Sequence, residues 1–414
     1  MRRKLYICRL KMKAPEIIPE GSKSHQAGVE KKNSKKAIQD MRFNVDGKAF
    51  QQQLQAVGKV INAKNSLNIL DNFLLRVEGD ILSITGSDQE NSLTARVAVT
   101  ESEGDGIIAI PARRLLEITK EVSNQPITVE VNDDTKRIDI RFLNGHFEFM
   151  GIPGEDYPLP IAVQGENVTT MTLPAQMVSE GIEHTLYAAS ADTLRPVLMG
   201  IYWDIHEDDV TFVSSDTHKL VRYISRMAQP GFRASFILAP KAANILRSLI
   251  GKDMADVKLS FNEKSGLFEF GDYELTCMFI NGVYPNYERV IPRENPFVVT
   301  VDRASILTAL RRVTLFANKA SNLVVVNVGD NNMQLMAQDL DYGMSAQENV
   351  NCDYDGNPMT IGFNGAFMVE IINNLPGDTI QLKLSDPARP GVYAPLTEND
   401  GQDTVVIQMP MQVI

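Results

Sequence analysis

The segment VTFVSSDTHKLVRYIS (residues 210–225) has the pattern of a β-hairpin: an apolar strand, an Asp, a few polar residues and a second apolar strand. The same outline occurs in LSITGSDQENSLTARVAV (82–99) and in MQLMAQDLDYGMSAQENV (333–350). Asp88, Asp216 and Asp339 therefore occupy one repeat position. Self-similarity at a nearly constant spacing is typical of repeat architectures, so we expect one type of domain to be present three times.

A short strand and an amphipathic helix precede each hairpin. They occupy MRFNVDGKAFQQQLQAVGKVINAK (41–64), NVTTMTLPAQMVSEGIEHTLYAAS (167–190) and FVVTVDRASILTALRRVTLFANK (297–319). Asp46 and Asp302 suit the N-cap of the first and third helices, and Pro174 suits the first helical position of the second. A second strand and helix follow each hairpin, at 106–123, 234–251 and 359–377, before strand-like alternation resumes.

Each third of the chain therefore holds two helices packed on antiparallel strands. The expected helices are 48–66, 112–124, 174–190, 240–252, 302–319 and 364–375. Helices of this length bury one stripe on a sheet and leave the other face exposed. The sequence predicts an α+β fold with three tandem domains over residues 41–165, 166–292 and 293–414.

The composition is that of an ordinary globular protein. Of 414 residues, 43% are hydrophobic and 22% are charged, and the chain is long enough for two to four domains. No apolar run approaches the roughly 18 residues that a membrane-spanning helix needs, so we expect no membrane association. The three cysteines, Cys8, Cys277 and Cys352, are few and odd in number, which indicates a reducing compartment and a cytoplasmic protein.

Residues 1–40 differ from the rest of the chain in charge. They hold 11 Lys or Arg and four Asp or Glu, so they carry +7 while residues 41–414 carry −18 of the total of −11. They also lack the continuous apolar core of a signal peptide. We expect a disordered basic extension, or an upstream translation artefact, because a strand pattern starts directly at Met41. A basic arm that contacts nucleic acid is the alternative.

The basic residues of this acidic chain gather on the expected helices. Those six segments hold 13 basic and six acidic residues, a net charge of +7. Lys and Arg are good helix formers, but Glu is equally good and is scarce here. We interpret the asymmetry as functional, with the helices facing a polyanion and the sheets facing solvent.

Signals for catalysis and for cofactor binding are absent from the sequence. It contains no GxxxxGK[ST] loop, no GxGxxG after a strand and no CxxC, and HEDDV (206–210) has no second His at the spacing of a zinc helix. Ser214, Asp216 and His218 lie on one segment, whereas a catalytic triad converges from different elements. We expect the repeated Asp to shape its hairpin, and we predict no enzyme activity, no metal and no cofactor.

Several motifs resemble the bacterial sliding clamps, the beta subunits of the replicative DNA polymerase III. They are the three repeats from Met41, SDTHKL (215–220), YPNYERVIP (284–292) and the terminal MPMQVI (409–414). The resemblance covers 41–414 and none of 1–40. It implies a head-to-tail homodimeric ring that encircles double-stranded DNA by topology, without sequence preference. It also implies partners: the polymerase III catalytic subunit, the clamp loader, and other polymerases and repair proteins with clamp-binding motifs.

The resemblance further implies a pocket for partner peptides, with an apolar floor and a basic rim. Its residues would be Arg195 and Leu198 on an early strand of the middle third, with Ser215, Thr217, His218, Lys219, Leu220, Pro285, Arg289, Val290, Ile407, Met409, Pro410 and Met411. Three positions depart from the family pattern, because Thr217 replaces a common Gly, Lys219 a common Arg, and Gln412 a common basic residue. Leu198, Leu220 and Val290 could alternatively be plain core residues.

Two more surfaces are implied by the same resemblance. Phe147 and Phe149 on the last strand region of the first third would meet Leu315 and Phe316 of the other chain. Of the residues that would face DNA, the resemblance implies only Lys64, which matches a family position near DNA. The others are expected there because they are basic residues of the expected helices: Lys48, Lys59, Arg113, Arg114, Lys120, Lys241, Arg247, Arg311 and Arg312.

Two other classes of function remain open from the residues alone. One is a three-domain enzyme that binds a small anionic substrate on its basic helices, but it would need an acid-base cluster in one third. The other is a monomeric three-repeat scaffold that binds proteins and does not encircle DNA.

Overall fold

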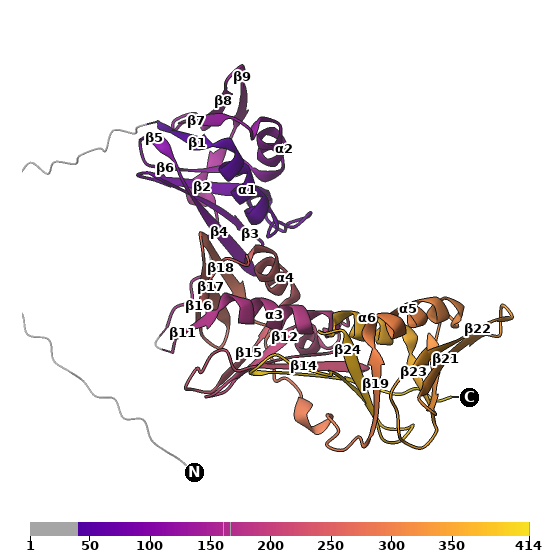
Figure 1. Ribbon diagram of the computed structural model, residues 1–414. Coiled ribbons are helices and arrows are strands. Elements are labelled where there is room, and N and C mark those ends of the chain that lie inside the picture. The colour runs from indigo at the N-terminus through magenta and orange to yellow at the C-terminus, as the bar shows by residue number, and fades with distance from the viewer. Residues whose placement is uncertain (1–39, 160, 166, 414) are drawn as a thin grey trace, which may run out of the picture. The chain divides into compact units, whose positions relative to one another are not determined.

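The computed structural model describes residues 40–413 except 160 and 166 (Figure 1). Apart from Asp40, the expected basic extension lies outside the described residues. The described chain contains six α-helices and 26 strands, and the strands form four antiparallel sheets. This confirms the predicted α+β class. The domain boundaries at 165/166 and 292/293 stay a prediction.

The same order of elements occurs three times, with two additional strands, β5 and β10, in the first repeat. The first repeat has β1 (Met41–Asp46), α1 (Gly47–Gly58), β2 (Asn72–Glu78), β3 (Ile81–Ser87), β4 (Asn91–Ala98), β5 (Thr100–Glu103), β6 (Gly106–Pro111), α2 (Ala112–Val122), β7 (Pro126–Asn132), β8 (Arg137–Phe142), β9 (Gly145–Met150) and β10 (Ile152–Pro153). The second has β11 (Thr169–Pro174), α3 (Ala175–Thr185), β12 (Ile201–Ile205), β13 (Val210–Ser215), β14 (Lys219–Ser225), β15 (Ala234–Leu238), α4 (Pro240–Leu249), β16 (Asp256–Phe261), β17 (Ser265–Phe270) and β18 (Tyr273–Met278). The third has β19 (Phe297–Asp302), α5 (Arg303–Val313), β20 (Leu323–Gly329), β21 (Asn332–Asp339), β22 (Met344–Asn351), β23 (Met359–Asn364), α6 (Gly365–Asn374), β24 (Thr379–Leu384), β25 (Gly391–Pro395) and β26 (Gln402–Gln408).

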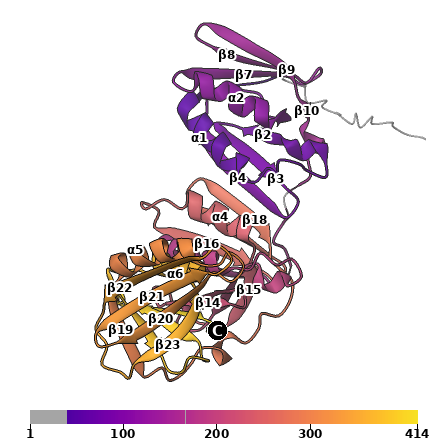
Figure 2. The same cartoon turned by 90° about the vertical axis from the view of Figure 1, so that its right-hand side faces the viewer.

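Two of the sheets continue from one repeat into the next. In the nine-stranded sheet β4 of the first repeat pairs with β18 of the second, and in the eight-stranded sheet β14 of the second pairs with β26 of the third. Figure 2 shows β4 beside β18. Backbone hydrogen bonds therefore join the repeats, and each junction uses the second hairpin strand of one repeat and the last strand of the next.

Within each repeat the two helices pack against each other: α1 on α2, α3 on α4, and α5 on α6. Their apolar stripes are buried on the strands, as Phe50 and Leu54 of α1 and Leu310 of α5 illustrate with no exposed surface. One core cluster runs through the first and second repeats, and another joins the third repeat to Ala188 and Val221 of the second. The cores thus cross the same junctions as the sheets.

The helices end earlier than the sequence pattern predicts. Apolar periodicity continues past α3 and α5 because each runs into a short 3-10 turn, Leu186–Ala188 and Thr314–Phe316. Lys59 is the C-cap of α1, while Lys64, Lys252 and Lys319 lie beyond the helices. The six helices consequently hold nine basic and five acidic residues, so their net charge is +4 and not +7.

The predicted caps are largely confirmed. Asp46 accepts a hydrogen bond from the Ala49 N–H at 2.8 Å, and Asp302 accepts one from the Ser305 N–H at 2.7 Å. Pro174 is a correction, because it still belongs to β11 and α3 begins one residue later. Its extended ψ of 131° keeps it paired in the strand ladder opposite Asp256.

The repeated Asp shapes its hairpin, as predicted. Asp88 Oδ1 accepts from the N–H groups of Glu90 (3.0 Å) and Asn91 (2.6 Å), and Asp216 Oδ1 accepts from those of His218 (2.9 Å) and Lys219 (2.8 Å). Asp339 makes one such bond, from Asp341 at 3.1 Å. The third hairpin is longer, since Asp339 pairs with Met344.

The Asp302 cap supports a stability prediction. Replacing Asp302 with Ala should lower the unfolding free energy by about 1 kcal/mol at neutral pH in urea denaturation, since two donors lose their acceptor. Asn caps equally well, so Asp302→Asn is the matched control.

Asp and Asn at position 302 should differ in how their stabilisation of the fold depends on pH. Hydrogen bonds from Ser305 lower the pKa of Asp302 in the folded state, so its stabilisation is present above the unfolded pKa and is lost as pH falls through the folded pKa. The wild type should therefore weaken relative to Asp302→Asn in acid. Equal stability of the Ala variant and the wild type at neutral pH would contradict this role.

Candidate binding pocket and repeat junctions

A cavity of about 240 Å³ lies where the second and third repeats meet. Its walls come from the second hairpin, the connector after β18 and the last residues of the chain. The lining residues are Leu198, Ser215, Thr217, His218, Lys219, Leu220, Tyr284, Pro285, Asn286, Tyr287, Val290, Ile407 and Met409. Ten of the fourteen predicted pocket residues are among them.

The floor of the cavity is buried and its rim is open. Leu198 and Leu220 are at most 7% exposed, whereas Val290 is 51% and Met409 is 44% exposed. Tyr284, which lines the cavity, stacks on Tyr202 with ring centroids 4.7 Å apart. The alternative that these leucines and Val290 are plain core residues therefore fits Leu198 and Leu220, which belong to a small core cluster. It does not fit Val290, which is exposed. Such a cavity can receive the apolar side chains of a short peptide.

The hairpin places the polar side of the cavity. Lys219 is almost buried, with its ammonium 2.6 Å from Asp216, 3.1 Å from Glu370 and 4.3 Å from the centre of the Phe367 ring. His218 also stacks on Phe367, at 5.9 Å. Two carboxylates neutralise the charge of Lys219 locally. Lys219 therefore links the second and third repeats and does not add positive charge to the rim of the cavity.

Thr217 shows why glycine suits the hairpin tip. Its φ of 77° lies in the left-handed region, where a β-branched residue is strained, and the equivalent Gln89 of the first repeat has a φ of 81°. The Thr217 N–H donates to the Ser215 hydroxyl at 3.1 Å, which helps to hold this conformation. The departure from glycine changes the side chain beside the pocket while the turn is kept.

Four predicted pocket residues lie outside the lining: Arg195, Arg289, Pro410 and Met411. Arg195 is also not on a strand, because Pro196 starts a 3-10 turn (Pro196–Leu198) for which Arg195 is the N-cap. Met411 instead donates its N–H to Gly362 O at 2.8 Å. The prediction missed Tyr284, Asn286 and Tyr287, although all three lie in the quoted YPNYERVIP segment and two of them are aromatic.

The basic residues expected to face DNA are mostly exposed. Lys48, Lys59, Lys64, Arg113, Arg114, Lys120, Arg247, Arg311 and Arg312 are all exposed, on or just after α1, α2, α4 and α5. Several are partly neutralised: Arg113 and Arg114 both contact Glu117, and Arg312 contacts Glu348. The helix surface is therefore only weakly positive.

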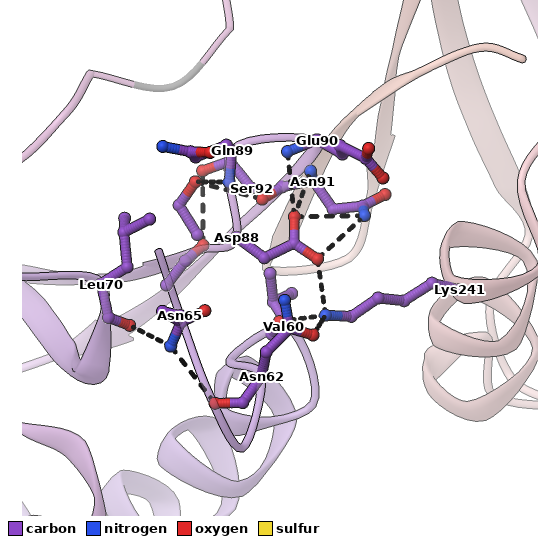
Figure 3. Close-up of polar contacts among 12 residues, drawn as sticks. Val60, Asn62, Asn65, Leu70, Asp88, Gln89, Glu90, Asn91, Ser92 and Lys241 are labelled. Carbon is purple, nitrogen blue, oxygen red and sulfur yellow. Dashed lines mark hydrogen bonds and ion pairs between the residues drawn. The ribbon is translucent and has the colours of Figure 1, made fainter. Parts of the chain in front are cut away.

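Lys241 is placed differently from the others, at the junction of the first two repeats (Figure 3). From α4 its ammonium reaches Asp88 Oδ2 at 2.5 Å, Asn62 Oδ1 at 2.6 Å and the carbonyl oxygen of Val60. The Asp88 side chain is 4% exposed. Lys241 thus fills a cage of three acceptors in the neighbouring repeat, which the pattern of charges along the helices could not reveal.

The predicted seam residues lie at two free sheet edges. Phe147 and Phe149 are on β9, the edge strand of its sheet, and Phe147 stacks on Phe142 at 5.1 Å. Leu315 and Phe316 are 66% and 38% exposed in the 3-10 turn after α5, and this turn packs against β22, the edge strand of the last sheet.

Among the described residues no group of three or more His, Cys, Asp or Glu side chains could hold a metal ion. Over the same part of the chain, no helix has the length and apolar character needed to traverse a lipid bilayer.

Comparison with known proteins points to one family. The chain matches the family models for the DNA polymerase III beta subunit: the N-terminal domain over residues 41–161, the central domain over 172–286 and the C-terminal domain over 288–412.

Individual relatives agree with these matches. The chain is 26% identical to the beta sliding clamp of Pseudomonas putida, over 90% of this chain and all of that protein, and 29% identical to that of Synechococcus elongatus, over 83% and 92%. The crystal structure of the Pseudomonas aeruginosa sliding clamp bound to griselimycin is similar with a TM-score of 0.85 and 25% identity, over 90% of this chain and all of that one. The chain therefore belongs to the DNA polymerase III beta subunit family, the bacterial sliding clamps.

Proposed function

We propose that this protein is a sliding clamp, a non-enzymatic processivity factor that encircles duplex DNA as a homodimeric ring. The observation that carries the proposal is a pair of complementary open edges. By repeat position β22 corresponds to β4 and β14, and β9 corresponds to β18 and β26. Two of the three possible junctions are made within the chain, so β22 and β9 are free to pair with a second copy.

The two junctions within the chain also predict the register of the third. Thr276 lies opposite Ser92, and Ile407 lies opposite Leu220. Residues are equivalent when the same steps across paired strands lead to them from the first strand of their repeat to the last. By this criterion Glu148 is the equivalent of Thr276 and Ile407.

On the other side of the junction, Ser345 is the equivalent of Ser92 and Leu220, because each pairs with the residue before the hairpin Asp. Glu148 of one chain should therefore face Ser345 of the other, with Phe147 opposite Ala346. This contact would bring Phe147 and Phe149 near the partner's Leu315 and Phe316, and two such contacts close a two-fold ring.

The charge distribution suits binding by topology. The helices have a net charge of +4, and several of their arginines are paired with carboxylates. A ring needs only a weak, sequence-independent positive lining, because phosphate contacts position a protein without reading sequence. We propose that the exposed basic residues on or just after α1, α2, α4 and α5, apart from Arg113, supply this lining. The half-buried Lys241 serves the junction instead.

The apolar cavity would tether the partners. We propose that it binds the hydrophobic anchors of clamp-binding motifs in the polymerase III catalytic subunit, the clamp loader, and other polymerases and repair proteins. The exposed Val290 and Met409 at the rim, with the buried Leu198 and Leu220 below, support this role. A protein with these partners would act in the cytoplasm, at the chromosome.

The ring predicts how the protein is held on DNA. After loading by its clamp loader onto nicked circular duplex, it should stay on the circle during gel filtration and should run off once the circle is cut. Direct affinity for linear DNA should be weak and should fall steeply with salt. Equal retention on circular and linear DNA would contradict topological binding.

The pocket predicts the effect of one side chain. Met409→Ala should weaken binding of a peptide with the polymerase's clamp-binding motif roughly tenfold, the loss expected for one apolar anchor. Met278→Ala is the matched control, because Met278 occupies the equivalent position at the other junction and is 42% exposed. Substitution is preferable to truncation, because the tail is held by bonds from Met409 N to His218 O and from Met411 N to Gly362 O. Unchanged affinity in calorimetry, with unchanged melting, would remove the pocket assignment.

A further inference from the structure

We propose that Arg113 of one chain binds the paired carboxylates of Asp339 and Asp341 of a second copy, and so completes the third of three equivalent cation cages. This inference rests on the proposed homodimer and names the polar contact that closes it. It also assigns Arg113 to the subunit junction and not to the DNA surface that the charge of the helices predicts.

The first cage shows what such a site contains. Val60 O, Asn62 Oδ1 and Asp88 Oδ2 surround the Lys241 ammonium, which comes from the next repeat (Figure 3). Asn62 lies 16 residues after the capping Asp46, and Asp88 is the hairpin Asp. Both positions can therefore be located in the other repeats.

In the second repeat the cage is filled from within. The hairpin Asp216 is paired with Lys219 of the same hairpin at 2.6 Å. The neighbouring helix α6 has Ala366 two residues after its N-cap Asn364, where α4 has Lys241 two residues after Ala239. The neighbour thus offers no cation at the junction where the hairpin supplies its own.

In the third repeat the acceptors are present without a cation. Asn318 lies 16 residues after the capping Asp302, and its Nδ2 contacts both Asp339 (3.5 Å) and Asp341 (3.3 Å). Among the described residues neither carboxylate has an ion pair. Asp339 is 2% exposed, and the extra length of this hairpin places the exposed Asp341 beside it. Two carboxylates held together repel each other and favour a cation between them.

The matching cation lies on the helix that would face this cage. Arg113 is two residues after Pro111, the N-cap of α2, so it is the equivalent of Lys241. Its side chain is 91% exposed, and its ion pair in the chain is with Glu117 on the same helix. An arginine can bind two carboxylates through its fork of donors, which suits a cage with two acids. Pairing of β9 with β22 of a second copy would bring α2 to this hairpin, as pairing of β18 with β4 brings α4 to Asp88.

A charge-reversal cycle tests the contact on the full-length protein. The dimer dissociation constant is measured by sedimentation or dilution for the wild type, Arg113→Glu, Asp341→Arg and the double variant. Each single reversal should weaken the dimer about tenfold or more, because like charges then face each other, and the double variant should return to near the wild-type value. Asp341 is chosen because it is exposed, so its substitution leaves the fold intact.

The controls separate this inference from the homodimer on which it rests. Arg233→Glu makes the same change in net charge on an exposed arginine that lies in a connector before β15, and it should leave dimerisation unchanged. A wild type that is monomeric at all concentrations would overturn the homodimer and this contact together. Two results would overturn the Arg113 contact alone while the wild type is dimeric. One is that the single reversals leave the dimer dissociation constant unchanged. The other is that the double variant weakens the dimer as much as the two single reversals combined.

Discussion

The pairing of one repeat's second hairpin strand with the last strand of the next repeat is the contact on which the rest of the molecule depends. It merges separate sheets into continuous ones, and the cores follow across the same boundaries. It also leaves β9 of the first repeat and β22 of the third as edge strands, at the positions that are paired in the other repeats. Exposed edge strands invite pairing with another chain, and natural proteins usually block them. Here we propose that β9 and β22 pair between two copies, because they occupy the repeat positions that pair at the two junctions within the chain.

The same junction forms the cavity that we propose as the partner pocket. Residues 215–220 form the tip of the hairpin whose second strand pairs with β26, so Ile407 and Met409 reach the cavity as a result of that pairing. Lys219 forms ion pairs with Asp216 of the second repeat and Glu370 of the third, and so holds the two repeats together. A binding site at a domain junction thus needs no element of its own. In the proposed function, the weakly positive helices surround DNA, which is held by enclosure, and the apolar cavity holds partner proteins by their side-chain anchors.

Much of the fold could be predicted from the sequence, because its signals are local. The hairpin Asp and the capping Asp46 and Asp302 act on N–H groups two or three residues away, so their positions in the sequence define their roles. Helix ends were less predictable, because the 3-10 turn at Leu186–Ala188 keeps an apolar spacing close to that of a helix. The role of Lys241 was missed, because it depends on Asp88, 153 residues away, and counting charges on helices carries no information about such a partner. Within the pocket, the hairpin residues were found but Arg195 was misplaced, since Pro196 starts a 3-10 turn there and no strand.

The central claim is that a second copy completes the chain's third junction in the register of the first two. Disulfide formation between Phe147→Cys and Ala346→Cys in one protein tests it directly, because residues opposite each other on paired antiparallel strands have Cβ atoms about 5 Å apart. The account predicts a covalent dimer on oxidation that remains on closed circular DNA, whereas the parent protein with its native cysteines stays uncrosslinked. The absence of a covalent dimer, or equal crosslinking when the second cysteine is moved to Gln347, would contradict it.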